Sequence, residues 1–214
     1  MAMAQHKRRV VERYEIDTLG APFKVTLLNC VTLTVDPQTG DEKINVPDVA
    51  GLIGTVVRAR VSHPRKLNGK EIRFVRNALG LKAGQLAKFL GMGPEHFSRC
   101  EAGKKVMAEV SEKMFRLFAY LATHFPDPQE LLTQISDGQA NIDKGLEATA
   151  KKPIETAKKF MEQFLMIKIQ SVFDPVELNF ELRRIETSDS NAPPIDEENE
   201  EEWEIEPRQM ATCG

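Results

Sequence analysis

Hydrophobic and polar residues alternate along the first part of the chain, which is the pattern of half-buried β-strands. Apolar residues stand at every second position over 23–27 and again over 31–35. The segment 36–40, Asp-Pro-Gln-Thr-Gly, is a turn sequence, because Pro presets φ and Gly allows a positive φ. We therefore expect a small β-rich module over residues 21–62. Before it, residues 1–20 are expected to be a basic arm or a frayed first strand.

After Pro47 the spacing of apolar residues changes from two to three and four. Apolar residues over 49–57 fit a helix, although their β-branched side chains leave a strand open. Asn68 is a predicted N-cap for the next helix, and two short helices and a longer amphipathic helix follow it. Residues 63–126 are thus predicted to form one helical domain.

The C-terminal part combines a helical pattern with one late strand. A stripe of apolar residues from Ile142 to Ile167 indicates a long helix. Residues 176–183 alternate strictly, so they predict a strand that must pair with the N-terminal module or with a partner subunit. We expect residues 127–186 to form this helical region with its strand. Residues 187–214 are expected to be a disordered acidic tail, because so polar a segment buries little apolar surface.

Together these patterns predict a mainly α protein. We expect a helix-turn-helix bundle with a small N-terminal β-rich module, a C-terminal helical region with a late strand, and a disordered acidic tail. Trp203 and Ile205 are the apolar exceptions in that tail. A solvated tail is the simpler interpretation, and a docking anchor at Trp203 is the alternative.

The net charge of -3 hides two opposite blocks. Residues 58–105 carry twelve Lys and Arg against three acids, a net charge of +9. Residues 174–214 carry three Arg against thirteen acids, a net charge of -10. A basic block of this size is typical of a module that binds a polyanion, and the acidic block indicates a separate tail.

The three cysteines, Cys30, Cys100 and Cys213, lie far apart and lack the paired spacing of a zinc site. We interpret them as free thiols of a reducing cytoplasm. No apolar run reaches the length of a membrane span, and the basic N-terminus lacks the apolar core of a secretory signal. The sequence therefore predicts a cytoplasmic protein without metal or cofactor. The four histidines are scattered and no nucleophile or phosphate-loop motif occurs, so we do not expect an enzyme.

Residues 67–105 carry the offsets of a DNA-binding helix-turn-helix. Ala87 stands where the two helices approach most closely, and a Gly in the turn allows a positive φ. Glu101 is expected to pair with Arg73 or Arg76 on the preceding helix, which is a structural role. The predicted structural residues of the motif are Ala87, Gly91, Phe97, Cys100, Glu101 and Arg73.

The second helix of the motif, over residues 94–102, is the predicted recognition helix. If this helix enters a major groove, its exposed N-terminal side chains face the base edges. Arg99 could then donate two hydrogen bonds to guanine, and Glu95 could accept one from cytosine. The candidate base-contacting residues are Glu95, His96, Ser98 and Arg99. The candidate phosphate-contacting residues, which would supply affinity but not sequence choice, are Lys82, Gln85, Lys88, Lys104 and Lys105.

The run LGLKAGQLAKFLGMGPEHFSRCEAGKK resembles the lambda-repressor-like (Cro/C1, XRE) helix-turn-helix family, whose usual run is LGLSQxELAxLLGVSxxTISRWExGK. The resemblance covers about residues 67–125 and implies a helical DNA-binding domain. Four of the departures from the family affect the helix caps and the core of the motif. Lys82 and Ala83 replace its Ser-Gln opening, Gly93 replaces the Ser that caps the recognition helix, and Cys100 replaces a Trp.

The preceding region is similar to antitoxins of the MqsA-like group. The resemblance consists of the β-hairpin, the turn, and a Pro-Asp-x-x-Gly-Leu helix leading into L-x-G-x-EIRFxR. In that group an N-terminal zinc module carries CPxCG at the turn. Here Asp36 and Thr39 stand where the thiolates would be, so the resemblance implies a module that has lost its metal.

These features predict a sequence-specific regulator that binds double-stranded DNA, either a repressor or an antitoxin-like autoregulator. We expect a homodimer, because one recognition helix reads few base pairs and two-fold operators are the usual solution. The stripe 142–167 is a candidate for the dimer contact, and internal core packing explains it equally well. The alternative is an antitoxin or adaptor that acts mainly by binding a toxin or another protein, with an auxiliary or vestigial helix-turn-helix.

Overall fold

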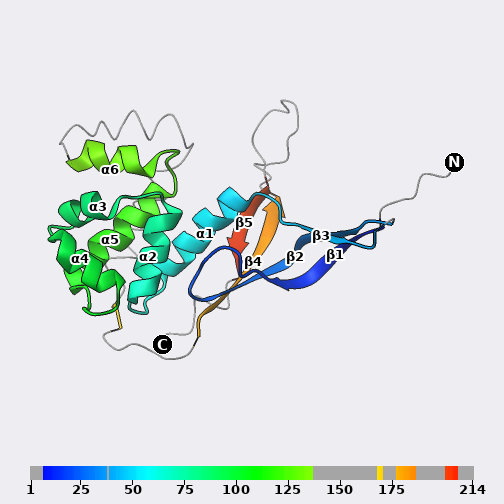
Figure 1. Cartoon of the computed structure of the whole chain (residues 1–214), viewed down its shortest axis with the longest axis horizontal. Helices are drawn as coiled ribbons and strands as arrows, with labels where there is room; N and C mark the ends of the chain where they lie inside the picture. Colours follow the sequence, from blue (N-terminus) through cyan, green and yellow to red (C-terminus); the bar gives the residue numbers. More distant parts are fainter. Residues whose placement is uncertain (1–6, 38, 137–167, 171–176, 187–200, 207–214) are drawn as a thin grey trace. The chain divides into compact units, whose positions relative to one another are not determined.

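The computed structural model describes residues 7–37, 39–136, 168–170, 177–186 and 201–206 (Figure 1). The chain forms two compact units. The first joins Met1–Val56 with Glu177–Gly214, and the second is Val57–Val176. In the described part the protein has six α-helices and a five-stranded mixed sheet. The expectation of a mainly α protein is therefore wrong, and the fold is mixed α and β.

The sheet of the first unit is organised around β2 (Lys24–Val35), its longest strand. One edge of β2 pairs antiparallel with β1 (Lys7–Glu15). Its other edge pairs antiparallel with the short strand β3 (Glu42–Asn45) after the predicted turn. A β-bulge interrupts the β1–β2 pairing near Asn29, whose φ is 54°. Asparagine tolerates this left-handed conformation better than most residues, so the bulge is compatible with the sequence.

The remaining strands come from the C-terminal part of the chain. β4 (Asn179–Glu186) pairs in parallel with residues 24–28 of β2, and β5 (Glu201–Ile205) pairs antiparallel with β4. The late strand expected from the sequence is therefore present, and it pairs with the N-terminal strands of its own chain. Leu27 and Leu182 lie opposite each other in this pairing, and both are fully buried.

The charged segment at residues 7–15 is strand β1, and not a free arm. Its Arg13 forms an ion pair with Glu181 of β4. Arg8 and Arg9 are exposed, whereas Val11 and Tyr14 are half-buried. The high charge of this strand hides its alternation, so its sequence is compatible with a basic arm as well as with a first strand.

The expectation of a disordered acidic tail is wrong for residues 201–205, which form β5. Trp203 is only 7% exposed, and its indole Nε1 donates a hydrogen bond to the Asp48 carbonyl oxygen at 3.1 Å. The guanidinium carbon of Arg184 lies 5.3 Å from the centre of the Trp203 ring, within the range of a cation–π contact. Trp203 is thus a core residue of the first unit. Residues 187–200 and 207–214 lie outside the described part.

The second unit is a helical bundle that follows α1 (Val49–Ser62), and the boundary between the units falls inside that helix. Its helices are α2 (Gly69–Ala78), α3 (Ala83–Phe89), α4 (Pro94–Glu101), α5 (Glu109–Ala122) and α6 (Pro128–Ser136). Phe115 and Ala119 of α5 are fully buried, which places α5 at the centre of this unit (Figure 1). None of the helices described is long and apolar enough to cross a membrane. The apolar stripe 142–167 lies outside the described residues.

The burial of Trp203 gives a direct test of the fold, because it is the only tryptophan of the chain. We expect its fluorescence in buffer to be blue-shifted and shielded from iodide, and to move to the red when urea unfolds the protein. Trp203→Ala should lower the free energy of unfolding by about 3–5 kcal/mol. Glu202→Ala, at the exposed neighbour, should change it by less than about 0.5 kcal/mol. Equal emission in buffer and in urea would contradict this placement.

Candidate nucleic-acid interface

Helices α3 and α4 and the turn between them form a helix-turn-helix in the second unit (Figure 1). Ala87 of α3 and Phe97 of α4 are fully buried, and Cys100 is only 1% exposed. Gly91 in the turn has a φ of 66°, a conformation that glycine adopts without strain. The Met92 amide closes the turn by donating to the Ala87 carbonyl at 2.8 Å. Ala87, Phe97 and Cys100 thus lie in the core between the two helices, and Gly91 lies in the turn.

An ion pair joins the end of α4 to α2. The Arg76 Nε lies 2.7 Å from the Glu101 Oε1, and both side chains are largely buried. The Arg76 Nη1 also donates to the Leu81 carbonyl at 3.0 Å, just before α3. Of the two partners expected for Glu101, the structure therefore has Arg76. Arg73 is exposed and takes no part in this pair, which corrects its assignment as a structural residue of the motif.

The first residue of α2 packs directly on the backbone at the end of α4. A Cβ added to Gly69 would lie 2.5 Å from the Cys100 carbonyl oxygen and 2.7 Å from the Gly103 nitrogen. Only glycine permits this approach of two backbones. The sequence marked Asn68 as an N-cap but gave no sign of this contact, because it depends on the tertiary arrangement.

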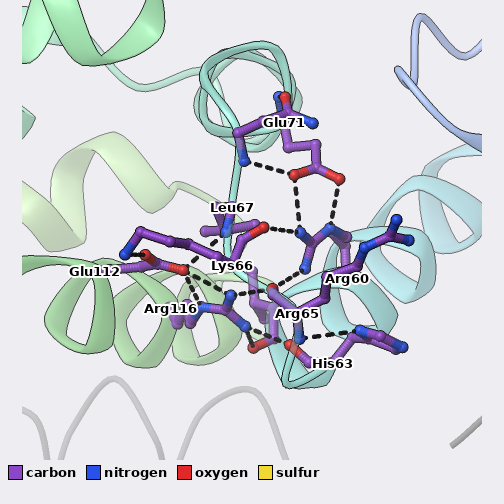
Figure 2. Close-up of polar contacts among 10 residues, drawn as sticks. Arg60, His63, Arg65, Lys66, Leu67, Glu71, Glu112 and Arg116 are labelled. Carbon is purple, nitrogen blue, oxygen red and sulfur yellow. Dashed lines mark hydrogen bonds and ion pairs between the residues drawn. The ribbon is translucent and has the colours of Figure 1, made fainter. Parts of the chain in front are cut away.

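The start of α2 is fixed by a capping box and a buried ion pair (Figure 2). The Asn68 side chain accepts from the Glu71 amide at 3.0 Å, and the Glu71 carboxylate accepts from the Asn68 amide at 2.7 Å. The same carboxylate accepts two hydrogen bonds of 2.8 Å from Arg60, whose side chain is fully buried. This two-point pairing ties the end of α1 to the start of α2.

A second buried carboxylate, Glu112, ties the same region to α5 (Figure 2). It lies 2.9 Å from the Lys66 Nζ and 2.7 Å from Arg116, and its Oε1 also accepts from the Leu67 amide at 2.9 Å. Burial is the main cause that lowers the pKa of Arg116, to about 10, so this residue stays cationic at neutral pH. Arg116 and Arg60 also donate to backbone carbonyls of the 61–66 segment.

His63 lies at the edge of this polar cluster. Its Nδ1 accepts a hydrogen bond from the Arg65 amide at 3.2 Å, which requires a deprotonated Nδ1. Burial, followed by the positive charges of Arg60, Arg116 and Arg65, lowers the pKa of His63 from 6.5 to about 4. His63 is therefore neutral at physiological pH. A second proton on its ring would place a positive charge beside the surrounding cations.

All four predicted base-contacting side chains are exposed on α4. Glu95, His96, Ser98 and Arg99 point away from the core that Phe97 and Cys100 build. A shallow surface depression on this face is lined by Gly93, Pro94, Glu95, His96, Arg99 and Lys105. The helix thus presents hydrogen-bond donors and acceptors to solvent, with Glu95 and His96 in its first turn and Ser98 and Arg99 in its last.

The predicted phosphate contacts fall into two groups. The side chains of Lys82, Lys88, Lys104 and Lys105 are exposed. Gln85 is half-buried, and its Oε1 accepts a hydrogen bond of 2.6 Å from Gln129 of α6. The Gln129 side-chain oxygen accepts in turn from the Lys82 amide at 2.8 Å. Gln85 is therefore held by the bundle, and the four lysines are the available cations.

Comparison of the chain with protein-family models, with curated proteins and with solved structures found no match in any of the three. Within the residues that the structure describes, no group of three or more His, Cys, Asp or Glu is placed to hold a metal ion. Cys30 and Cys100 are free thiols, and burial is the main cause that raises the pKa of each.

The contact at Gly69 predicts opposite effects for two glycine substitutions. Gly69→Ala should lower the free energy of unfolding by about 1–3 kcal/mol, because its Cβ would displace backbone at the end of α4. Gly84→Ala, in α3, meets no atom within 4 Å and should raise it by up to about 1 kcal/mol, since alanine favours a helix. Urea unfolding of both variants tests this, and equal effects would show that the close approach does not exist.

The lowered pKa of His63 predicts a loss of stability in mild acid. Between pH 6.5 and about 4 the unfolded chain binds a proton at His63 that the folded chain does not bind. The contribution of neutral His63 to the free energy of unfolding should therefore be fully present above about pH 6.5. It should decrease as the pH drops below that value. Burial also lowers the pKa of His124, so both residues contribute. His63→Asn keeps a hydrogen-bond acceptor but cannot titrate. It should therefore reduce the loss of unfolding free energy that urea titrations measure between about pH 6.5 and 5, where carboxylates remain ionised.

Proposed function

We propose that the chain is a sequence-specific regulator that binds double-stranded DNA and inserts α4 into the major groove. The observation that carries this proposal is the separation of roles along α4. Its core positions hold the helix against α3, while Glu95, His96, Ser98 and Arg99 stay exposed along its other face. This face combines a guanidinium, a carboxylate, an imidazole and a hydroxyl, which are groups that can form hydrogen bonds with base edges.

The charges around α4 support the same function. Lys82 and Lys88 flank α3, and Lys104 and Lys105 follow α4 directly. The amides of Lys104 and Lys105 both donate to the Arg99 carbonyl, at 2.9 and 3.1 Å. These hydrogen bonds fix the backbone of the two lysines at the end of α4. Cations beside a reading helix supply affinity for phosphates without adding sequence choice. We propose a repressor or antitoxin-like autoregulator of the cytoplasm as the biological form of this activity.

Binding of a toxin or another protein is a second candidate function, and one observation favours it. The sheet built from β1–β5 belongs to a separate compact unit, whereas the whole helix-turn-helix belongs to the other. A second unit of this size is not needed for reading DNA. A protein partner on the sheet unit would be consistent with an antitoxin that binds both operator and toxin.

Arg99→Ala and Lys104→Ala should weaken DNA binding in different ways. Duplexes are first selected from a random pool with the full chain, and affinities are then measured by fluorescence anisotropy across a salt series. Arg99→Ala should cost about 1–3 kcal/mol and relax the choice of one base pair. Lys104→Ala should weaken all duplexes alike and reduce the salt slope by about one.

The matched control is Arg9→Ala, which removes an exposed cation from the sheet unit. It should leave both the selected sequence and the salt slope unchanged. Failure of the wild-type chain to enrich any duplex would refute the proposed function. Enrichment that survives Arg99→Ala with the same base preference would refute the assignment of α4 as the reading helix.

A further inference from the structure

Two exposed cations of α2 take no part in the contacts that hold the helical unit together. Lys70 and Arg73 lie three residues apart, and positions at this spacing are neighbours on one face of a helix. Among the residues that the structure describes, neither side chain has an acid or a carbonyl as its partner. The role expected for Arg73, a pair with Glu101, belongs to Arg76. The two cations are therefore available to a ligand.

The positions of these two cations are unfavourable for α2 itself. Lys70 lies in the first turn of the helix, where the helix dipole favours an acid and opposes a cation. Arg73 follows on the same face, and like charges that are neighbours on a helix are mildly destabilising. The acid of that turn, Glu71, is buried, and Figure 2 shows its carboxylate bound to Arg60. The pair on α2 thus does not stabilise the fold.

The cations of α5 are arranged differently, because each has an acid on its own helix. Lys113 lies 2.7 Å from Glu109, and Arg116 lies 2.7 Å from Glu112. Residues 58–105, in contrast, expose seven Lys and Arg side chains and a single acid, Glu95. An excess of exposed cations that costs the helix stability favours a polyanion as the partner that offsets it.

The close contact at Gly69 places the pair on α2 beside the lysines that follow α4. A Cβ on Gly69 would lie 2.7 Å from the Gly103 nitrogen, so the start of α2 lies against the loop that carries Lys104. Lys105, the next residue, lines the same surface depression as Arg99 of the proposed reading face. The cations of α2 therefore continue a basic surface that begins at α4.

We propose that Lys70 and Arg73 bind phosphates of the DNA backbone, so that α2 extends the contact surface beyond the two helices of the helix-turn-helix. This inference rests on the proposed function, because its partner is the duplex that α4 reads. The two side chains add affinity and salt dependence, and they leave the choice of base pairs to α4. The capping box and the buried pair of Glu71 with Arg60 fix the backbone from which both cations project.

Lys70→Ala and Arg73→Ala test this contact in the full chain, with the duplex that the wild type selects. Each substitution should reduce the slope of log affinity against log salt concentration by about one, and the double variant by about two. The preferred base pairs should not change. In urea unfolding both variants should be at least as stable as the wild type, because alanine removes a charge that the helix does not favour. A residue with a purely structural role would lose stability instead.

Lys113→Ala is the matched control, since it removes one cation of the same unit at a position that has an acid as its partner. It should leave the salt slope unchanged. Ethylation interference then locates the phosphates. Ethylation of the phosphate that Arg73 binds should weaken the wild type and leave Arg73→Ala unaffected. This phosphate should neighbour the one that Lys104→Ala identifies in the same way.

Three results would overturn this inference alone while the wild type still selects a duplex. They are salt slopes that both α2 variants leave unchanged, an equal fall of the slope in Lys113→Ala, and an interference pattern that Arg73→Ala does not alter. A slope that falls for heparin and not for the duplex would assign the pair to another polyanion and also contradict it. A wild-type chain that enriches no duplex would refute the proposed function, and this inference with it.

Discussion

Two buried carboxylates hold the helical unit together. Glu71 and Glu112 accept hydrogen bonds from Arg60, Lys66 and Arg116, and Arg60 and Arg116 also donate to carbonyls of the segment between α1 and α2. Removing one partner of such a cluster leaves an uncompensated charge in the interior, which typically costs about 3–5 kcal/mol. The arrangement of α1, α2 and α5 therefore depends on all five side chains being present together.

The orientation of the exposed face of α4 depends on this cluster. Glu71 fixes where α2 begins, and Gly69 in that first turn contacts the backbone at the end of α4. Arg76, farther along α2, holds Glu101. The orientation of the α4 face is thus set from its buried end, while α4 itself lacks a side-chain cap at Gly93. Support from the interior therefore compensates for the missing side-chain cap at the start of α4.

Local features were predictable from the sequence, and distant pairings were not. The positions of Ala87, Gly91 and Phe97 follow from fixed offsets within one short stretch, so the motif could be derived. Strand β5 could not, because its burial depends on Trp203 meeting Asp48 across the chain. The burial of charges could not be predicted either. Three cations of the +9 block, Arg60, Arg65 and Lys66, lie inside the unit, and so do two of its three acids, Glu71 and Glu101. The exposed part of the block therefore stays strongly basic.

The parallel pairing of β2 with β4 constrains the order in which the chain can fold. Val25 pairs with Phe180, and the entire helical unit is inserted between these strands. Closing so long a loop is entropically costly, and non-local strand pairing is slow. The helical unit relies on contacts closer in sequence and can form first. During synthesis β2 therefore lacks its neighbour β4 until residues 179–186 have left the ribosome. A chaperone or a partner that shields this edge would act in that interval.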